Sequence, residues 1–222
     1  MKNDLYIACL DLTDKRCLVV GAGPVGLEKA RGLLAAHARV VVVAPQACEA
    51  IRALAAAATL EWRERAYESS DLDGCFLVIA ATSREELNRR VHADAEARSM
   101  LVNVADVPDL CNFILPAIAR EGPVAVAVST TGASPALAQR MRREAAEAFG
   151  PAYARLAELL AELRPWAKEN LPTYQDRKAF FDDIVNGDPD PIGLLQGGRI
   201  EDVRARIRSL RQKHSEHLAD SS

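Results

Sequence analysis

The first half of the chain alternates between short apolar runs and longer amphipathic stretches. Strands buried on both faces read as continuous apolar runs, whereas a helix on a sheet shows an apolar residue every three or four positions. Repeated alternation of the two predicts an α/β fold with a mostly parallel, doubly wound sheet. The expected strands cover residues 17–20, 39–44, 60–62, 75–81 and 100–104, with a helix over 48–58.

Two smaller signals belong to this half. Ser83 and Glu86 have the spacing of a capping box, so Ser83 is the expected N-cap of the helix before the last of these strands. Near the N-terminus, Leu5, Ile7 and Cys9 alternate with other residues, which predicts a short strand ahead of the first βαβ unit.

The pattern changes after residue 111. Residues 112–116 and 124–129 have the composition of strands, and residues 117–123, which join them, end in the turn pair Gly-Pro. Because no helical stretch separates the two runs, we expect them to pair antiparallel, outside the parallel sheet.

The rest of the chain is predicted to be helical. Ser134 and Pro135 have the order of a helix cap followed by a proline in the first turn, and this helix should end near Phe149. Further helices are expected over 154–170, interrupted at Pro165, and over 173–185 and 200–210.

The strongest local signal is a G-x-G-x-x-G turn between the first expected strand and a helix. Gly21 suits the tight turn, Gly23 lets the backbone approach a pyrophosphate, and Gly26 lets the helix pack closely on the strand. Pro24 fits the first helical turn. Enclosed by strand, helix and strand, the turn predicts a dinucleotide-binding domain of the Rossmann type. The alternative is a glycine turn in an α/β domain that binds nothing.

The end of the second strand departs from the usual pattern. An NAD site commonly has Asp or Glu about 20 residues beyond the glycines, on the ribose hydroxyls. This chain has Val-Ala-Pro-Gln at 43–46, with neither an acid nor an arginine. These residues therefore predict a dinucleotide without deciding between NAD and NADP.

Three polar residues follow expected strands at their carboxyl ends, where open α/β sheets bind ligands. Thr82 and Ser83 follow the fourth strand, and Asp106 follows the fifth. A carboxylate near the nicotinamide end of a dinucleotide suits a general base. The alternative for Asp106 is an aspartate that only caps a turn.

The loop over residues 129–135 is a second candidate site. Its sequence, STTGASP, places hydroxyls and free N–H groups at a helix N-terminus, an arrangement that binds anions such as carboxylates. Ser134 also has the simpler role of a cap. The arginine-rich stretch over 204–211 is most simply a solvated helix face, with the grip of an acidic substrate as the alternative.

Composition narrows the classes of function. The chain has 49% hydrophobic and 27% charged residues, typical of a globular protein, and its net charge of −3 gives no basic excess for nucleic acid. No uncharged apolar run is long enough for a membrane span, and the N-terminal residues lack the apolar core of a signal peptide. Five scattered cysteines without C-x-x-C suit reduced thiols in the cytoplasm, and the four histidines form no metal-ligand cluster.

Four motifs then appear in a characteristic order between about residues 4 and 153: VVGAGPVGLEKARGLL, IAATS, NVADVPDLCNFILPA and VAVSTTGASPALAQRMR. Together they resemble the precorrin-2 dehydrogenase family, which includes the N-terminal half of siroheme synthase and a bifunctional dehydrogenase and ferrochelatase. The match covers only the dehydrogenase part of the fused enzymes, so we do not expect synthesis of precorrin-2 itself.

The resemblance implies an NAD-dependent oxidation of precorrin-2 to sirohydrochlorin, in siroheme synthesis, by a cytoplasmic homodimer. Some members also insert ferrous iron or cobalt, which makes Fe²⁺ or Co²⁺ a further candidate substrate. The expected parts are an NAD-binding Rossmann domain over 1–111, a dimerisation segment over 112–150 and a helical domain over 151–222.

The resemblance also assigns residues. Asp106 matches the essential aspartate of the family. The expected dinucleotide contacts are Gly21, Gly23, Pro24, Val25, Gly26, Pro45, Gln46 and Thr82. The expected contacts of the tetrapyrrole carboxylates are Asn112, Ser129, Thr130, Gly132, Ser134 and Arg140, with Arg143 nearby.

Two other functions fit parts of the sequence. One is a non-catalytic NAD-sensing domain, although such modules usually keep the acid after the second strand. The other is a redox enzyme for a different small substrate. The loop at 129–135 and the motif around Asp106 favour the tetrapyrrole over both.

Overall fold

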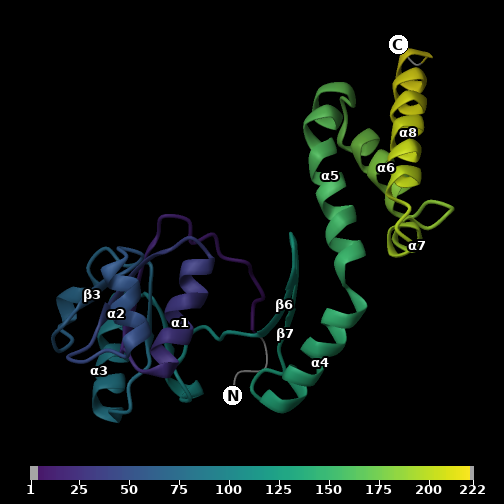
Figure 1. The fold of residues 1–222 in the computed structure, drawn as a ribbon. Helices are drawn as coiled ribbons and strands as arrows, with labels where there is room; N and C mark the ends of the chain where they lie inside the picture. Colours follow the sequence, from purple (N-terminus) through teal and green to yellow (C-terminus); the bar gives the residue numbers. More distant parts are fainter. Residues whose placement is uncertain (1–4, 221–222) are drawn as a thin grey trace. The chain divides into compact units, whose positions relative to one another are not determined.

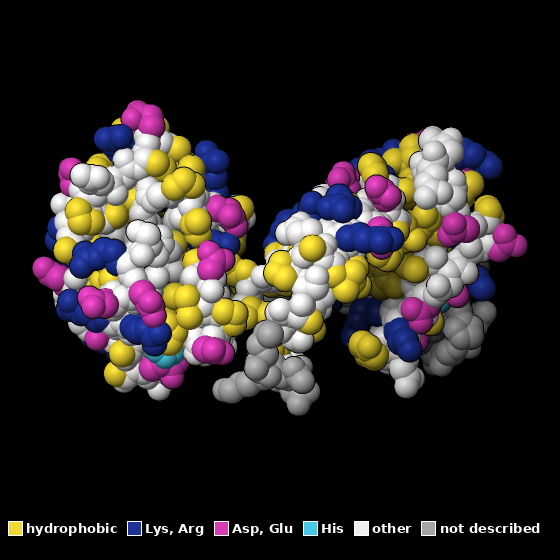
Figure 2. All heavy atoms as spheres, turned by 90° about the horizontal axis from the view of Figure 1, so that it is seen from below, with side chains coloured by type: hydrophobic (Ala, Val, Ile, Leu, Met, Phe, Trp, Pro, Cys, Tyr) yellow, Lys and Arg dark blue, Asp and Glu magenta, His cyan; other side chains and the backbone are white. Residues whose placement is uncertain are grey.

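The chain forms two compact units, Met1–Leu115 and Pro116–Ser222. The computed structural model describes residues 5–220, and side chains up to residue 215 (Figure 1). In the described part, no helix is both long enough and apolar enough to cross a bilayer. On the face drawn in Figure 2, basic and acidic side chains are interspersed over both units, in keeping with a net charge close to zero.

The first unit contains the parallel sheet that the apolar runs predict. The strand order is β3-β2-β1-β4-β5, and all neighbours pair in parallel. The strands are β1 (Arg16–Val20), β2 (Arg39–Val43), β3 (Glu61–Arg63), β4 (Leu77–Ala80) and β5 (Leu101–Val104). The α/β, Rossmann-type fold expected from the sequence is confirmed.

Helices cover the two faces of this sheet unequally. One face packs with α1 (Pro24–Ala35) and α2 (Glu49–Ala56), the other with α3 (Glu85–Glu96). The link from β3 to β4 has no α-helix and only the short 3-10 helix η1 (Ser69–Leu72). The second face is therefore less completely covered beside β2 and β3.

Two expectations for this unit are wrong. Residues 5–10 form no strand, and Tyr6 and Ile7 are 95% and 82% exposed, because no neighbouring strand pairs with them. Ser83 is not a helix cap. The chain enters α3 one residue later, at Arg84, whose amide donates to the Thr82 hydroxyl at 3.1 Å.

The second unit starts with a two-stranded antiparallel sheet, β6 (Ala117–Glu121) and β7 (Val124–Val128). The antiparallel pairing is confirmed, but the first strand lies at the residues expected to join the two. Residues 112–116 form no strand, because Asn112 pairs instead with the edge of β5: its backbone amide donates to the Val102 carbonyl. Gly122, at φ +52°, makes the hairpin turn.

Five helices complete this unit: α4 (Pro135–Ala148), α5 (Pro151–Asn170), α6 (Tyr174–Val185), α7 (Pro191–Gln196) and α8 (Ile200–Asp220). Ser134 caps α4, as expected, by accepting from the Leu137 amide at 3.2 Å. Pro165 lies inside α5 without ending it, and α7, capped by Asp190, was not expected. A separate apolar core, which includes Leu159, Phe180 and Ile207, holds α5 to α8 together.

Candidate functional site

The glycine turn leaves β1 at the carboxyl edge of the sheet. Gly21 has φ +108°, and a Cβ there would collide with the Ala81 carbonyl. A Cβ on Gly26 would collide with the Gly21 carbonyl. Both positions therefore need glycine for the fold itself, whether or not a ligand is bound.

Gly23 is different, because the fold does not require a glycine there. Its φ is −81°, and a Cβ would meet no atom within 4 Å. The helix that starts here, α1, has no side-chain cap and no acidic residue in its first turn, with Pro24 at its start. An open space beside an uncapped helix N-terminus suits a phosphate group. The turn therefore fits the pyrophosphate of a dinucleotide.

The segment after β2 lies against this turn. The Cys48 amide donates to the Ala22 carbonyl at 2.9 Å, which ties the two loops together. Pro45 and Gln46, between β2 and that bond, are exposed. The structure thus brings these two expected contacts beside the glycine turn.

Thr82 follows β4 and borders the turn from the other side. Its methyl carbon would lie 3.1 Å from a Cβ on Gly21. Its hydroxyl donates to the side-chain oxygen of Asn88 at 2.7 Å, and the Asn88 amide donates to the Thr82 carbonyl at 2.9 Å. Asn88 is only 5% exposed and was missed from the sequence, where the signal is a polar residue on the apolar stripe of α3. The hydroxyl of Thr82 thus holds its own loop in place.

Asp106 lies at the same edge, after β5. The Ala105 amide donates to the Ala80 carbonyl at 2.9 Å, so this segment continues the pairing of β5 with β4. Asp106 is exposed, and its φ of +61° lies in the left-handed region. Within residues 5–215 its carboxylate has no hydrogen-bond or ion-pair partner. An unusual backbone conformation with a free carboxylate is typical of a functional residue.

Asn112 does not join this group. Its side-chain oxygen accepts from the Val102 amide at 2.8 Å, and its amide donates to the Met100 carbonyl at 2.8 Å and to Glu96 at 2.9 Å. These bonds close the outer edge of β5 near its start. The side chain is therefore occupied in structure.

The remaining candidates belong to the second unit. Ser129, Thr130 and Ser134 use their hydroxyls within the loop: Ser129 accepts from the Thr131 amide, and Thr130 accepts from the Ser134 amide, both at 3.1 Å. Thr131 and Gly132 are both left-handed, with φ of +51° and +87°. The loop is thus held in one shape by its own side chains. Arg140, one turn into α4, forms an ion pair with Glu144 at 2.8 Å.

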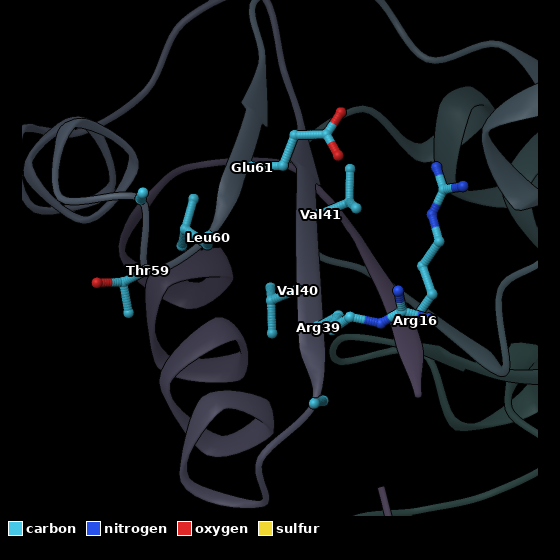
Figure 3. Close-up of a pocket in the computed structure, with 9 residues that line it drawn as sticks. Arg16, Arg39, Val40, Val41, Thr59, Leu60 and Glu61 are labelled. Carbon is cyan, nitrogen blue, oxygen red and sulfur yellow. The ribbon is translucent and has the colours of Figure 1, made fainter. Parts of the chain in front are cut away.

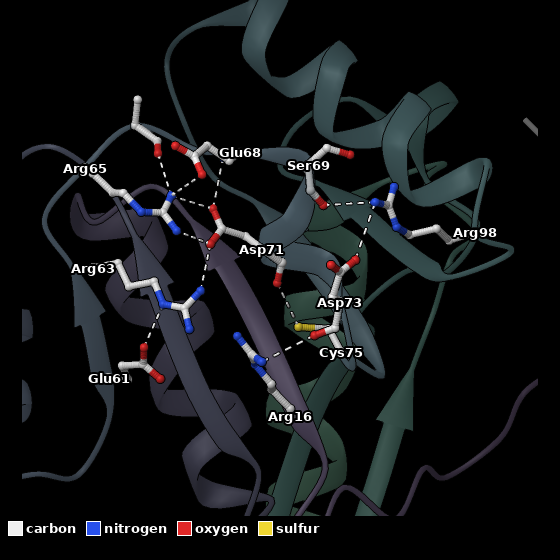
Figure 4. Close-up of polar contacts among 11 residues, drawn as sticks. Arg16, Glu61, Arg63, Arg65, Glu68, Ser69, Asp71, Asp73, Cys75 and Arg98 are labelled. Atoms are coloured by element: carbon white, nitrogen blue, oxygen red, sulfur yellow. Dashed lines mark hydrogen bonds and ion pairs between the residues drawn. The ribbon is translucent and has the colours of Figure 1, made fainter.

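A second carboxylate in the first unit contrasts with Asp106. Asp71 is fully buried, and it accepts hydrogen bonds from Arg63 at 2.7 Å, from Arg65 at 2.6 Å and from the Glu68 amide at 3.0 Å (Figure 4). Burial opposes its ionisation, but the bonds from Arg65, the Glu68 amide and Arg63 prevail and lower its pKa to about 2. No sequence pattern predicts this cluster, whose members lie at the end of β3 and in the segment that follows it.

The described residues contain no group of three side chains suited to hold a metal ion. His214 faces Asp183, with its Nε2 3.0 Å from a carboxylate oxygen, and its ring stacks edge-on against Phe180. It therefore packs within the helical unit. The side chain of His217 lies outside the described residues.

Three family models match consecutive stretches of the chain. A putative NAD(P)-binding family matches residues 8–117, the central region of sirohaem biosynthesis proteins matches 121–146, and the sirohaem synthase dimerisation region matches 152–210. The first unit thus matches, over nearly its whole length, a family described as putative NAD(P)-binding.

Individual proteins agree with these models. The siroheme synthase of Thioalkalivibrio sulfidiphilus is 44% identical over 206 residues, which are 92% of this chain and 41% of the relative. That of Pseudomonas entomophila is 45% identical over 172 residues, which are 78% of this chain and 37% of the relative. The chain therefore spans about two fifths of these relatives. Among solved structures, SirC, a precorrin-2 dehydrogenase, aligns with a TM-score of 0.77 and 25% identity, over 92% of this chain and all of SirC.

Proposed function

Because this chain belongs to the siroheme synthase family, we propose that it oxidises precorrin-2 to sirohydrochlorin, using a nicotinamide dinucleotide. The observation that carries the proposal is the free carboxylate of Asp106 at the same edge of the sheet as a turn that suits a pyrophosphate. SirC, which carries the name of this activity, supports it by its similarity over the whole of its length.

The first unit supplies the dinucleotide site. Gly23 and the uncapped start of α1 hold the pyrophosphate, Pro24 and Val25 border it, and Pro45 and Gln46 lie toward the ribose. Gly21, Gly26 and Thr82 keep these loops in position. Bound there, the dinucleotide supplies the acceptor for a hydride.

We propose NAD in place of NADP as the physiological dinucleotide. A 2′-phosphate is normally recognised by an arginine near the end of the second strand. Residues 44–46 offer no cation, and Arg63, at the end of β3, and Arg65, just after it, are both bound to Asp71. This position therefore has no free basic side chain that would bind the 2′-phosphate of NADP.

Asp106 takes the proton in the proposed reaction. Removal of two hydrogens from a carbon–carbon bond as a hydride and a proton requires a base beside the hydride acceptor. The exposed, unpartnered carboxylate of Asp106 lies at the carboxyl edge of the sheet, as that role requires.

The second unit would bind the carboxylates of the tetrapyrrole. The loop with Ser129, Thr130, Gly132 and Ser134 lies at the start of α4, and Arg140 would exchange its partner Glu144 for a substrate carboxylate. Asn112 is not part of this proposed site, because its side chain is bound at the edge of β5.

We further propose that the chain acts as a homodimer in the cytoplasm, with the parts 1–111, 112–150 and 151–222. The family model of the sirohaem synthase dimerisation region matches residues 152–210, C-terminal to the segment 112–150 expected from the sequence, and therefore supports dimer contacts through the helical part 151–222.

The test is an anaerobic assay with purified protein, enzymatically made precorrin-2 and either NAD or NADP. We expect NADH and sirohydrochlorin to form together, and a much lower rate with NADP. Addition of Fe²⁺ or Co²⁺ to the same cuvette tests metal insertion. If NAD binds but no tetrapyrrole is oxidised, the proposal fails and the chain acts as a nucleotide sensor.

A further inference from the structure

A pair of arginines lies at the amino-terminal edge of the parallel sheet, opposite the edge with the glycine turn. Arg16 and Arg39 are the first residues of β1 and β2, and they are in register with each other (Figure 3). Their strands place them on the face that η1 and α3 cover incompletely, since Leu18 and Val41, two residues further on, pack in the core of that face.

Neither arginine has an acidic partner among the described side chains. Arg39 donates its Nε to the Asp14 carbonyl at 2.8 Å, and Arg16 donates one terminal nitrogen to the Asp73 carbonyl at 3.3 Å. The Nε of Arg16 is buried without any hydrogen-bond partner. A buried donor without a partner is costly, so the hydrogen bonding of Arg16 is incomplete by itself.

Two arginines at the end of β3 and just after it have an anionic partner inside the protein. Arg63 and Arg65 converge on the buried carboxylate of Asp71. Their charges are satisfied inside the protein, on the same face of the same sheet. Arg16 and Arg39 have no such internal anion.

An open cavity of about 410 Å³ lies beside the pair. Its lining includes both arginines, Thr59 and parts of Val40 and Leu60, with Glu61 also at its wall. Glu61 is already bound to Arg63 at 2.6 Å, so its negative charge is largely compensated. Both arginines line this cavity, and their positive charges suit an oxyanion.

We propose that this cavity binds a small organic oxyanion, a phosphorylated or polycarboxylated metabolite, at a site separate from the dinucleotide. In this proposal Arg16 and Arg39 supply the positive charge that binds the oxyanion.

The experiment uses the full chain labelled with ¹⁵N-arginine and saturated with NAD, which blocks the glycine turn. Inorganic phosphate and citrate are titrated separately at constant ionic strength, and the arginine Nε–H signals are followed by NMR. The Arg16 signal is identified by its loss in Arg16→Lys. We expect it to shift with saturation for at least one of the two anions. Saturation by phosphate alone would indicate a phosphorylated ligand, and by citrate alone a polycarboxylate.

Variants separate this site from general salt effects. Arg16→Gln with Arg39→Gln should weaken binding by about 100-fold, near tenfold for each charged donor lost. A matched control, Arg89→Gln on the exposed face of α3, should leave the binding curve unchanged. The proposal would be overturned if the double variant bound the anions as tightly as the wild type. It would also be overturned if the Arg16 signal shifted linearly, without saturation, for both anions. Thermal unfolding of each variant establishes that it is folded.

Discussion

Two aspartates of the first unit have opposite surroundings. Asp71 is fully buried and bound by two arginines and a backbone amide, whereas Asp106 is exposed, left-handed and free of partners within the described residues. A carboxylate whose oxygens are fully used holds a structure together. One that the backbone presents without partners is available to a substrate. The neighbours of each aspartate thus separate a structural role for Asp71 from the catalytic role proposed for Asp106.

The largest expected effect comes from Asp106→Asn. Loss of a general base typically costs about 10²–10⁴ in rate, so kcat should fall by that amount. Asparagine accepts left-handed backbone, so the melting temperature and NAD affinity should not change. Turnover under anaerobic conditions and NAD titration measure the two quantities. Wild-type turnover in this variant would remove Asp106 from the mechanism and the comparison with it.

Asp71→Asn should lower the stability of the fold and leave kcat nearly unchanged, the reverse of Asp106→Asn. Neutralising the buried member of this ion cluster leaves Arg63 and Arg65 with only their exposed partners, Glu61 and Glu68, and costs about 3 kcal/mol of folding free energy. Denaturant unfolding measures the loss, and kcat of the protein that remains folded should stay near the wild-type value. An unaltered unfolding midpoint would show that the cluster adds nothing to stability.

Acid should distinguish the wild type from this variant. The pKa of Asp71 is lowered from 3.8 to about 2 in the folded protein, so its contribution is complete at neutral pH and is lost as the pH falls from about 4 toward 2. The difference in unfolding free energy between wild type and Asp71→Asn should therefore shrink by up to about 2 kcal/mol over that range. A difference that is constant from pH 7 to pH 3 would contradict the lowered pKa.

The smallest expected effects concern two glycines, one proposed to serve the cofactor and one required by the fold. Gly23→Ala should leave the melting temperature unchanged, because its Cβ enters open space, but weaken NAD binding about tenfold where the pyrophosphate approaches. Gly26→Ala should lower the melting temperature, because its Cβ meets the Gly21 carbonyl. Unchanged NAD affinity in Gly23→Ala would place the dinucleotide elsewhere.

The sequence predicted those features that depend on short stretches of chain. Continuous apolar runs such as the one ending at Val43 could only be strands buried on both faces, and the glycine spacing defined the turn. Ser134 was recognised as a cap because its partner is three residues away.

Features that depend on distant or competing partners were not predictable. Asn112 resembled a strand residue, but its bonds go to Met100 and Val102. Ser83 is not the cap, because the Arg84 amide donates to the Thr82 hydroxyl and the helix starts one residue later than expected. The partners of Asp71 are known only once the loop after β3 has folded back on itself.

One backbone hydrogen bond has a consequence for the dynamics of cofactor capture. The Cys48 amide and the Ala22 carbonyl join the loop proposed to hold the pyrophosphate to the loop proposed to border the ribose. This bond restrains the two loops relative to each other before any ligand binds. Much of the entropy that separate loops would lose on closing around a ligand is already lost when the chain folds, which favours tight capture without an induced closure.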